Sequence, residues 1–204
     1  MKKYKLSEIC DFNAYTINRK EAPQNILYLD TSSLTDNEVS SLQELEYESA
    51  PSRAQRIVKK NTILYSSVRP NQRHFGVFHE PQENLIASTG FVSINLKDEN
   101  EFSIDYLYLL LTQSYIVDYL QTIAENSVSA YPSINPSDIG NLSFDFPPLS
   151  EQKKIAAVLS SFDRQIALCR SQNETLEQMA KQLYDYWFVQ FDFPGADGKP
   201  YKSS

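Results

Sequence analysis

The sequence predicts an α+β protein: a small, irregular, mixed β-sheet domain with helices, followed by one long helix that forms a coiled coil. Three observations support this prediction. Short β-branched and aromatic runs fill the first half of the 204 residues, an apolar period of three to four residues begins at Ser103, and a period of seven begins after Pro148. We divide the chain into a domain over 1–148, a helix over 149–191, and a turn with a flexible tail over 192–204.

The predicted strands are short runs of β-branched and aromatic residues bounded by turn-forming residues. These runs are Ile26–Asp30, Thr62–Val68, Phe75–Phe78, Leu85–Leu96 with a break at Thr89 and Gly90, and a closing strand at Leu142–Phe146. Their shortness and uneven spacing predict a small sheet rather than a regular barrel or sandwich.

One helix is predicted from Ser103 to about Glu125, because apolar residues there recur every three or four positions. Ser103 is a suitable N-cap, since its hydroxyl can accept a hydrogen bond from an unpaired backbone N–H. A polar connection over 126–141 follows, and its Pro132 and Pro136 exclude a continuous helix there.

The segment after Pro148 carries two sets of residues spaced by seven, which together form one apolar seam. The d set is Ile155, Phe162, Cys169, Leu176 and Leu183, and the a set is Leu159, Ile166, Asn173, Ala180 and Trp187. About 40 helical residues span roughly 60 Å, which is too long for a domain of about 150 residues to bury. A helix folded back on its own domain is the alternative, but the length, the heptads and a polar Asn173 that fixes register favour association with another helix.

The net charge of the chain argues against a nucleic-acid partner, but the distribution of charges along the sequence does not. The net charge is −7, yet the stretch from Arg53 to His74 holds six Lys and Arg residues and no carboxylate. The flank from Glu21 to Glu48 holds seven carboxylates and no Lys or Arg. Phosphates are neutralised by a local excess of cations, so this basic stretch, which we call the basic island, is consistent with a nucleic-acid partner. An ordinary solvated charged face is the alternative.

Motifs of an enzyme, a metal site or a membrane protein are missing from the sequence. Five glycines form neither GxGxxG nor a P-loop, and GxSxG and HExxH do not occur. Cys10 and Cys169 lie far apart without CxxC spacing, which predicts neither a disulfide framework nor a zinc site. No apolar stretch approaches the roughly 20 residues of a membrane span, so we expect a soluble, cytoplasmic, non-catalytic protein.

Several blocks resemble one known family. The run PPLSEQKKIAAVLSSFDRQI, from Pro147 to Ile166, resembles the segment that joins a target recognition domain to a helical spacer in specificity subunits of type I restriction-modification systems. The block SAYPSINPSDIGNLSFDFPPL is similar to the end of such a recognition domain, and Tyr184 to Ser204 is similar to the end of the spacer. With KLSEICDFN matching the family's opening, the resemblance covers nearly the whole chain.

This resemblance implies a division of labour among subunits. The specificity subunit reads double-stranded DNA and binds no cofactor, modification subunits use S-adenosylmethionine for adenine methylation, and a motor subunit uses ATP and Mg for translocation and cleavage. Full-length members have two recognition domains and two antiparallel spacers, whereas this chain has one of each. A homodimer would rebuild the whole and read a palindromic target. A longer gene product or a different half-subunit partner remains an alternative, as does a coiled-coil adaptor whose globular domain binds protein or RNA.

Candidate DNA-reading residues are chosen by chemistry, because recognition domains vary within the family. Arginine suits guanine O6 and N7, and Asn or Gln suits adenine N6 and N7. The loop YSSVRPNQRHF between two predicted strands supplies Ser67, Arg69, Asn71, Gln72, Arg73 and His74. Lys59 and Lys60 are phosphate candidates, because an ammonium is a point charge, and Ser129 and Tyr131 of the SAYPS turn are candidates for backbone contact.

Overall fold

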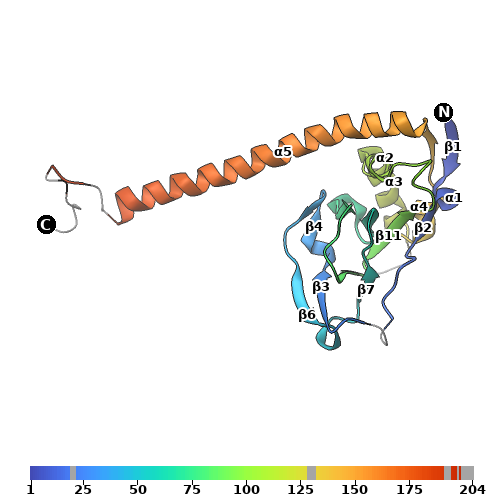
Figure 1. Cartoon of the computed structure of the whole chain (residues 1–204), viewed down its shortest axis with the longest axis horizontal. Coiled ribbons are helices and arrows are strands. Elements are labelled where there is room, and N and C mark those ends of the chain that lie inside the picture. The colour runs from blue at the N-terminus through green and yellow to red at the C-terminus, as the bar shows by residue number, and fades with distance from the viewer. Residues whose placement is uncertain (19–21, 128–131, 191–193, 197, 199–204) are drawn as a thin grey trace. The chain divides into compact units, whose positions relative to one another are not determined.

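The computed structural model describes residues 1–18, 22–127, 132–190, 194–196 and 198. The chain divides into two compact units, Met1–Ala156 and Ala157–Ser204. The first unit contains two four-stranded sheets and several short helices, and the second consists mainly of one long helix (Figure 1). Helix α5, Leu149–Tyr184, begins inside the first unit.

Two four-stranded sheets form the centre of the first unit. The first has the order β2 (Cys10–Phe12), β11 (Phe91–Leu96), β8 (Thr62–Ser66) and β9 (Phe75–Phe78), and all its pairs are antiparallel. The second has the order β6 (Gln43–Glu46), β3 (Asn25–Leu29), β10 (Leu85–Ser88) and β7 (Ala54–Ile57). Strands β3 and β10 are parallel, which makes this sheet mixed, as predicted.

Smaller elements complete the unit. Strands β1 (Lys2–Lys5) and β12 (Ser143–Phe146) pair antiparallel, as do β4 (Leu34–Thr35) and β5 (Glu38–Val39). The helices are α1 (Leu6–Ile9), α2 (Ile104–Leu111), α3 (Ser114–Glu125) and α4 (Pro136–Gly140), with 3-10 turns η1 (Thr31–Ser33), η2 (Tyr47–Ser49) and η3 (Pro70–Gln72).

Two short links between the sheets define two ends of the unit. Residues 58–61 lead from β7 to β8, and residues 89–90 lead from β10 to β11. Because β10 is antiparallel to β7 and β11 is antiparallel to β8, the start of β7, the end of β8 and the 89–90 link lie together. We call this the Ser67 end, and we call the opposite end, at residues 58–61, the Lys60 end.

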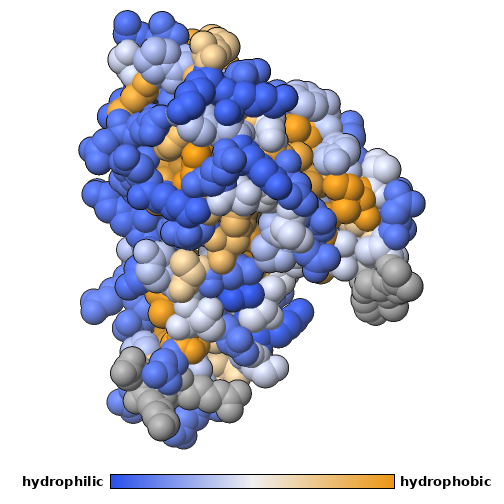
Figure 2. Space-filling view, turned by 90° about the vertical axis from the view of Figure 1, so that its right-hand side faces the viewer, coloured by the Kyte–Doolittle hydropathy of each residue, from blue (hydrophilic) through white to orange (hydrophobic). Residues whose placement is uncertain are grey.

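The core lies between the first sheet and the helices. Strand β8 is buried along its whole length, and Ile63, Tyr65 and Phe75 join Leu107 and Leu120 of α2 and α3 in the largest hydrophobic cluster. Figure 2 shows hydrophilic side chains over most of one face, with hydrophobic ones only in separate groups. Burial on both faces constrains the register of β8, because a slip of one residue would exchange the side chains that face two different hydrophobic clusters.

One prediction about the middle of the chain needs correction. The single helix from Ser103 to Glu125 is wrong: α2 ends before Thr112, whose hydroxyl donates to the carbonyl of Tyr108 over 3.0 Å, and α3 starts anew after an extended Gln113. The polar connection contains α4, with Pro136 at its first turn and a capping box from Asn135. Ser103 is the N-cap of α2, as predicted.

The long helix confirms its prediction. Helix α5 continues into a π-helical turn, η4, over Asp185–Val189. Its first turns belong to the first unit, where Gln152 and Ala156 are buried. From Ala157 onward, its side chains are almost all exposed within the single chain.

Candidate nucleic-acid interface

Four backbone segments converge at the Ser67 end. The backbone N–H and the hydroxyl of Ser67 donate to the carbonyl of Gly90 over 2.8 and 2.9 Å, and the N–H of Thr89 donates to the carbonyl of Arg53 over 2.8 Å. A Cβ atom at Gly90 would lie 2.6 Å from the Thr31 hydroxyl, so a larger residue there would have to displace the Thr31 side chain. The start of β7 and the ends of β3, β8 and β10 therefore form one firmly connected surface.

The predicted reading loop forms the turn η3 at this end. Arg69 and Arg73 flank the turn with positive φ of 48° and 57°, a conformation that residues other than glycine seldom adopt. The turn is held from outside, because the N–H of Arg69 donates to the carbonyl of Pro132 and the N–H of Asn71 donates to Oε1 of Gln121 on α3. Such over-determined strain is a frequent feature of ligand-contacting turns.

Some side chains of this turn contact other parts of the chain, and others are exposed to solvent. Arg73 Nε lies 2.6 Å from Asp36 Oδ1. His74 Nδ1 lies 2.7 Å from the carbonyl of Leu34, which can only accept, so Nδ1 carries the proton. Arg69, by contrast, is exposed, and no carboxylate of the described part of the chain lies within ion-pair distance of it.

The exposed amides of Asn71 and Gln72 lie beside Arg69 on η3, and Ser67 precedes the turn. The structure thus gathers Ser67, Arg69, Asn71, Gln72, Arg73 and His74 at one end of the first unit. Guanidinium and amide groups on a fixed turn offer the planar donor and acceptor pairs that base edges require.

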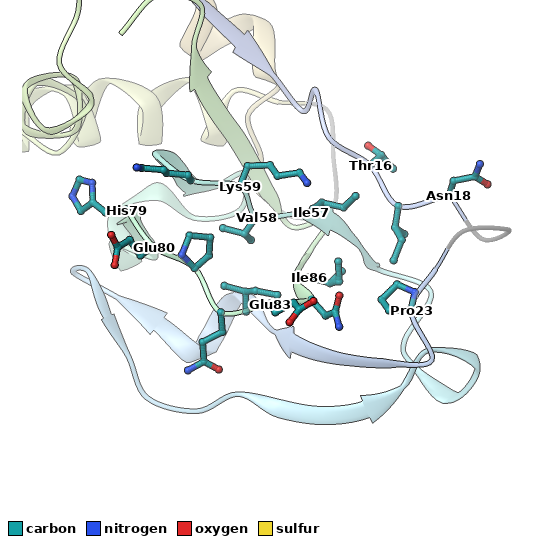
Figure 3. A pocket seen from close by; sticks show the side chains of 16 residues that line it. Thr16, Asn18, Pro23, Ile57, Val58, Lys59, His79, Glu80, Glu83 and Ile86 are labelled. Carbon is teal, nitrogen blue, oxygen red and sulfur yellow. The ribbon is translucent and has the colours of Figure 1, made fainter.

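Lys59 and Lys60 do not belong to that group. They line a cavity of about 640 Å³ at the Lys60 end, together with His79, Glu80 and Glu83 (Figure 3). The five residues of β8 separate the two ends by roughly 16 Å. His79 Nε2 lies 3.0 Å from Asp105 Oδ1 and its Nδ1 lies 3.2 Å from Asn61 Oδ1, which ties this ring to its surroundings.

Two candidates stay untested by geometry, since Ser129 and Tyr131 lie outside the described residues.

Two residues that contribute to the Ser67 end were not among the candidates chosen from the sequence. Asp30 and Arg53 flank the Ser67 end, with Arg53 Nη2 3.8 Å from Asp30 Oδ1. The available signal was weak: Arg53 opens the basic island, and Asp30 follows a predicted strand.

The acidic flank and the basic island are interleaved in space rather than separate. Asp30 and Asp36 of the flank approach Arg53 and Arg73 of the island. Burial acts to raise the pKa of Asp30, but hydrogen bonds from Tyr28, the Thr31 N–H and Ser32, with the charge of Arg53, outweigh it and lower that pKa. The Asp30 carboxylate therefore stays ionised at neutral pH.

Helix α5, with its continuation η4, carries the predicted seam. All ten seam residues from Ile155 to Trp187 are exposed in the single chain, and Phe162 and Leu176 show 62% and 61% of their surface. Val158 and Met179, at positions that flank the seam, widen this apolar surface. A helix with so much exposed apolar area is typical of one that packs against another chain.

The described residues contain neither a metal-binding cluster nor a membrane-spanning helix. No group of three or more His, Cys, Asp or Glu there is arranged to hold a metal ion. Within the same residues, no helix combines the length and apolar character that crossing a membrane requires.

Comparison with known proteins gives a consistent result. The profile of a family described as the type I restriction modification DNA specificity domain matches residues 1–178. The HindI specificity subunit of Haemophilus influenzae is 30% identical over 198 residues, which are 94% of this chain and 41% of that protein. The MjaIX specificity subunit of Methanocaldococcus jannaschii is 34% identical over 137 residues, which are 67% of this chain and 30% of that protein.

Solved structures show the same fold. The HsdS subunit from Thermoanaerobacter tengcongensis superposes with a TM-score of 0.71 at 21% identity and covers 96% of this chain and 50% of its own. A chain from a structural study of type I R-M complex assembly gives 0.69 at 22% identity, covering 98% and 51%. The chain thus spans about half of these structures and less than half of the curated relatives.

Proposed function

The chain belongs to the type I restriction modification DNA specificity domain family, and on that premise we propose that it is the DNA-reading subunit of a type I restriction-modification complex. The family match over residues 1–178 carries the proposal, because it covers both the sheet domain and most of α5. Specificity subunits are the non-catalytic members of such complexes. We assign the base-reading role to the first unit.

The geometry of the Ser67 end supports this assignment. An exposed Arg69 and the amides of Asn71 and Gln72 project from a turn whose backbone is fixed by Pro132 and Gln121. A rigid turn loses little conformational entropy on binding, which favours affinity and a defined register on the duplex. Lys59 and Lys60, at the other end, are assigned to phosphate contacts, which position without reading sequence.

We further propose that two copies associate through α5. One recognition unit and one spacer helix are about half of the related structures, and the exposed seam supplies the apolar area that a second helix would cover. Such a dimer would present two identical recognition units to inverted half-sites. The same helix would offer a surface to a modification subunit, which uses S-adenosylmethionine, while a restriction subunit uses ATP and Mg. We accordingly propose a cytoplasmic location for the protein, where its DNA target lies.

The test is selection from a pool of random DNA duplexes by the full chain, alone and with a co-expressed modification subunit. We expect enrichment of one palindromic, two-part motif. Failure to enrich any motif in both arms would refute the proposed function. Retention of single-stranded RNA or of a protein in place of duplex would instead identify a coiled-coil adaptor, and methyl transfer from S-adenosylmethionine by the chain alone would contradict a non-catalytic role.

A further inference from the structure

Arg53 occupies a defined place at the Ser67 end. It immediately precedes β7, and its carbonyl accepts a hydrogen bond from Thr89 in the link between β10 and β11. The neighbouring Gly90 accepts from Ser67, two residues before Arg69. Arg53 and Arg69 therefore sit at the same end, on segments that both bond to this short link.

The guanidinium of Arg53 faces a carboxylate on one side and solvent on the other. Its Nη2 lies 3.8 Å from Asp30 Oδ1, and 64% of its side chain is exposed, compared with 28% for Asp30. An ion pair this open stabilises a fold very little. A structural role in the free protein therefore explains the pair poorly.

Asp30 is held far more firmly than its partner. The hydroxyl of Tyr28, a residue only 3% exposed, donates to Asp30 Oδ1 over 3.0 Å, and the hydroxyl of Ser32 donates to Oδ2 over 3.2 Å. Both carboxylate oxygens are thus anchored before Arg53 is considered. A fixed carboxylate beside an exposed arginine limits the directions in which the guanidinium can point.

A guanidinium oriented in this way matches guanine. Its planar fork can donate to O6 and N7 of one base together, which a lysine ammonium cannot reproduce with the same geometry. The remaining N–H groups can keep their attraction to Asp30 while the fork is engaged, because the five donors of arginine lie on different edges.

We propose that Arg53, oriented by Asp30, reads a guanine in the DNA half-site, beside the bases contacted from η3. This inference rests on the proposed function and names a specificity-determining residue within it. Asp30 acts as a positioning residue, because it makes no contact with the base.

The test compares duplex selections by the full-length protein and its variants. Arg53→Lys keeps the charge and loses the fork, so we expect affinity for random duplex to stay within about twofold while preference for guanine at one motif position falls about tenfold. Asp30→Asn should weaken the same preference to a smaller degree. Arg164→Lys makes the same exchange on the exposed surface of α5 and should leave the motif unchanged, and circular dichroism melting verifies that each variant is folded.

The outcomes separate this inference from its premise. A folded Arg53→Lys variant that selects the motif of the wild type with the same base preferences would overturn the role of Arg53, while the proposed function would stand. No motif with the wild-type protein would overturn both. Loss of preference at a position that Asp30→Asn leaves untouched would refute the positioning role of Asp30.

Discussion

Nε of Arg73 lies 2.6 Å from Oδ1 of Asp36, and the two residues are also joined through the backbone, where the N–H of Asp36 donates to the carbonyl of Arg73 over 3.0 Å. The pair ties the turn between β4 and β5 to η3. The Arg73 guanidinium also lies 5.1 Å from the centre of the Phe75 ring. Arg73 thus has partners in the free protein, whereas Arg69 has no carboxylate partner among the described residues.

Asp36→Asn should strengthen DNA binding. The carboxylate competes with DNA for Arg73, and its removal also takes one negative charge from the Ser67 end, so we expect an affinity gain of about twofold to fivefold at low salt. Fluorescence anisotropy with the selected duplex measures it. Asp145→Asn changes the same charge on the exposed face of β12 and serves as the control. Equal gains from both variants would show that only net charge matters.

Arg69→Ala and Lys60→Ala should weaken binding in different ways. If Arg69 reads a base, its loss costs about 1–3 kcal/mol against the target and little against random duplex. Lys60→Ala should weaken both duplexes alike and reduce the slope of log affinity against log salt by about one. Anisotropy titrations at several salt concentrations decide this. Identical loss on target and random duplex for Arg69→Ala would contradict base reading, and Arg73→Ala provides the comparison with a partly engaged arginine.

Sequence patterns predicted those elements whose formation depends on residues close together in the chain. The strand Phe75–Phe78 matches β9 at both ends, and the break at Thr89 and Gly90 is where β10 passes to β11. Both follow from burial and turn chemistry within a few residues. The long helix follows equally from its heptads, because nothing but a regular helix places every seventh residue on one side.

Spatial relationships between residues far apart in the chain, or on either side of a strand, could not be predicted from the sequence. Strand β1, at the start of the chain, pairs with β12, which follows more than 130 residues later in the sequence. Nothing in the residues around either strand indicates that the two are partners. The basic island shows the same limit: Lys60 and Ser67 are close in sequence, but strand β8 between them places them at opposite ends. An extended strand separates its flanks, whereas a helix or turn of equal length would have kept them together.

Gln152→Leu should destabilise the first unit. The Gln152 side chain is 1% exposed, accepts from the N–H of Ser103 and donates to the carbonyls of Glu101 and Pro147. Leucine leaves three polar groups without partners, so we expect a loss of about 2–4 kcal/mol in the free energy of unfolding. Urea denaturation followed by circular dichroism measures it. Gln178→Leu, on the exposed face of α5, should change stability by less than about 0.5 kcal/mol.

Gln152→Glu separates hydrogen bonding from packing at the same position. It preserves volume but turns a donor toward two carbonyls into an acceptor, so the ionised variant should also be unstable near neutral pH. Protonation at low pH restores one donor and should recover part of the loss relative to the wild type at the same pH. A glutamate variant as stable as the wild type at pH 7 would show that Gln152 contributes by shape alone.

Phe162→Asp should dissociate the proposed dimer. Phe162 is 62% exposed in the single chain and sits in the seam, where a charge would be buried without a partner on association. We expect the dissociation constant to rise at least about 100-fold by sedimentation velocity. Gln178→Asp places the same charge at an outward heptad position and should leave the dimer intact. Two equally dimeric variants would exclude the seam from the interface, and Leu176→Asp repeats the test near the other end.

Antiparallel pairing of two α5 helices makes a specific prediction about register. Full use of the seam places Ile155 opposite Trp187, Leu159 opposite Leu183, Phe162 opposite Ala180, Ile166 opposite Leu176, and Cys169 opposite Asn173. Each bulky residue then meets a residue that leaves it space or extends the apolar contact. The polar Asn173 meets Cys169 near the centre, where its buried amide would penalise any shifted register.

Asn173→Cys tests that register, because it brings a new thiol opposite Cys169 of the partner helix. Mild oxidation should give a covalent dimer on a non-reducing gel, and cleavage after Arg170 separates the two positions, so mass spectrometry identifies the joined peptides. Cys10 stays silent, since burial leaves it 2% exposed and raises the pKa of its thiol to about 12. Antiparallel helices give links between positions 169 and 173, whereas parallel helices give 169 to 169 and 173 to 173. Gln178→Cys, on the outer face, should give no covalent dimer. Like-to-like links would overturn the antiparallel arrangement of the two helices.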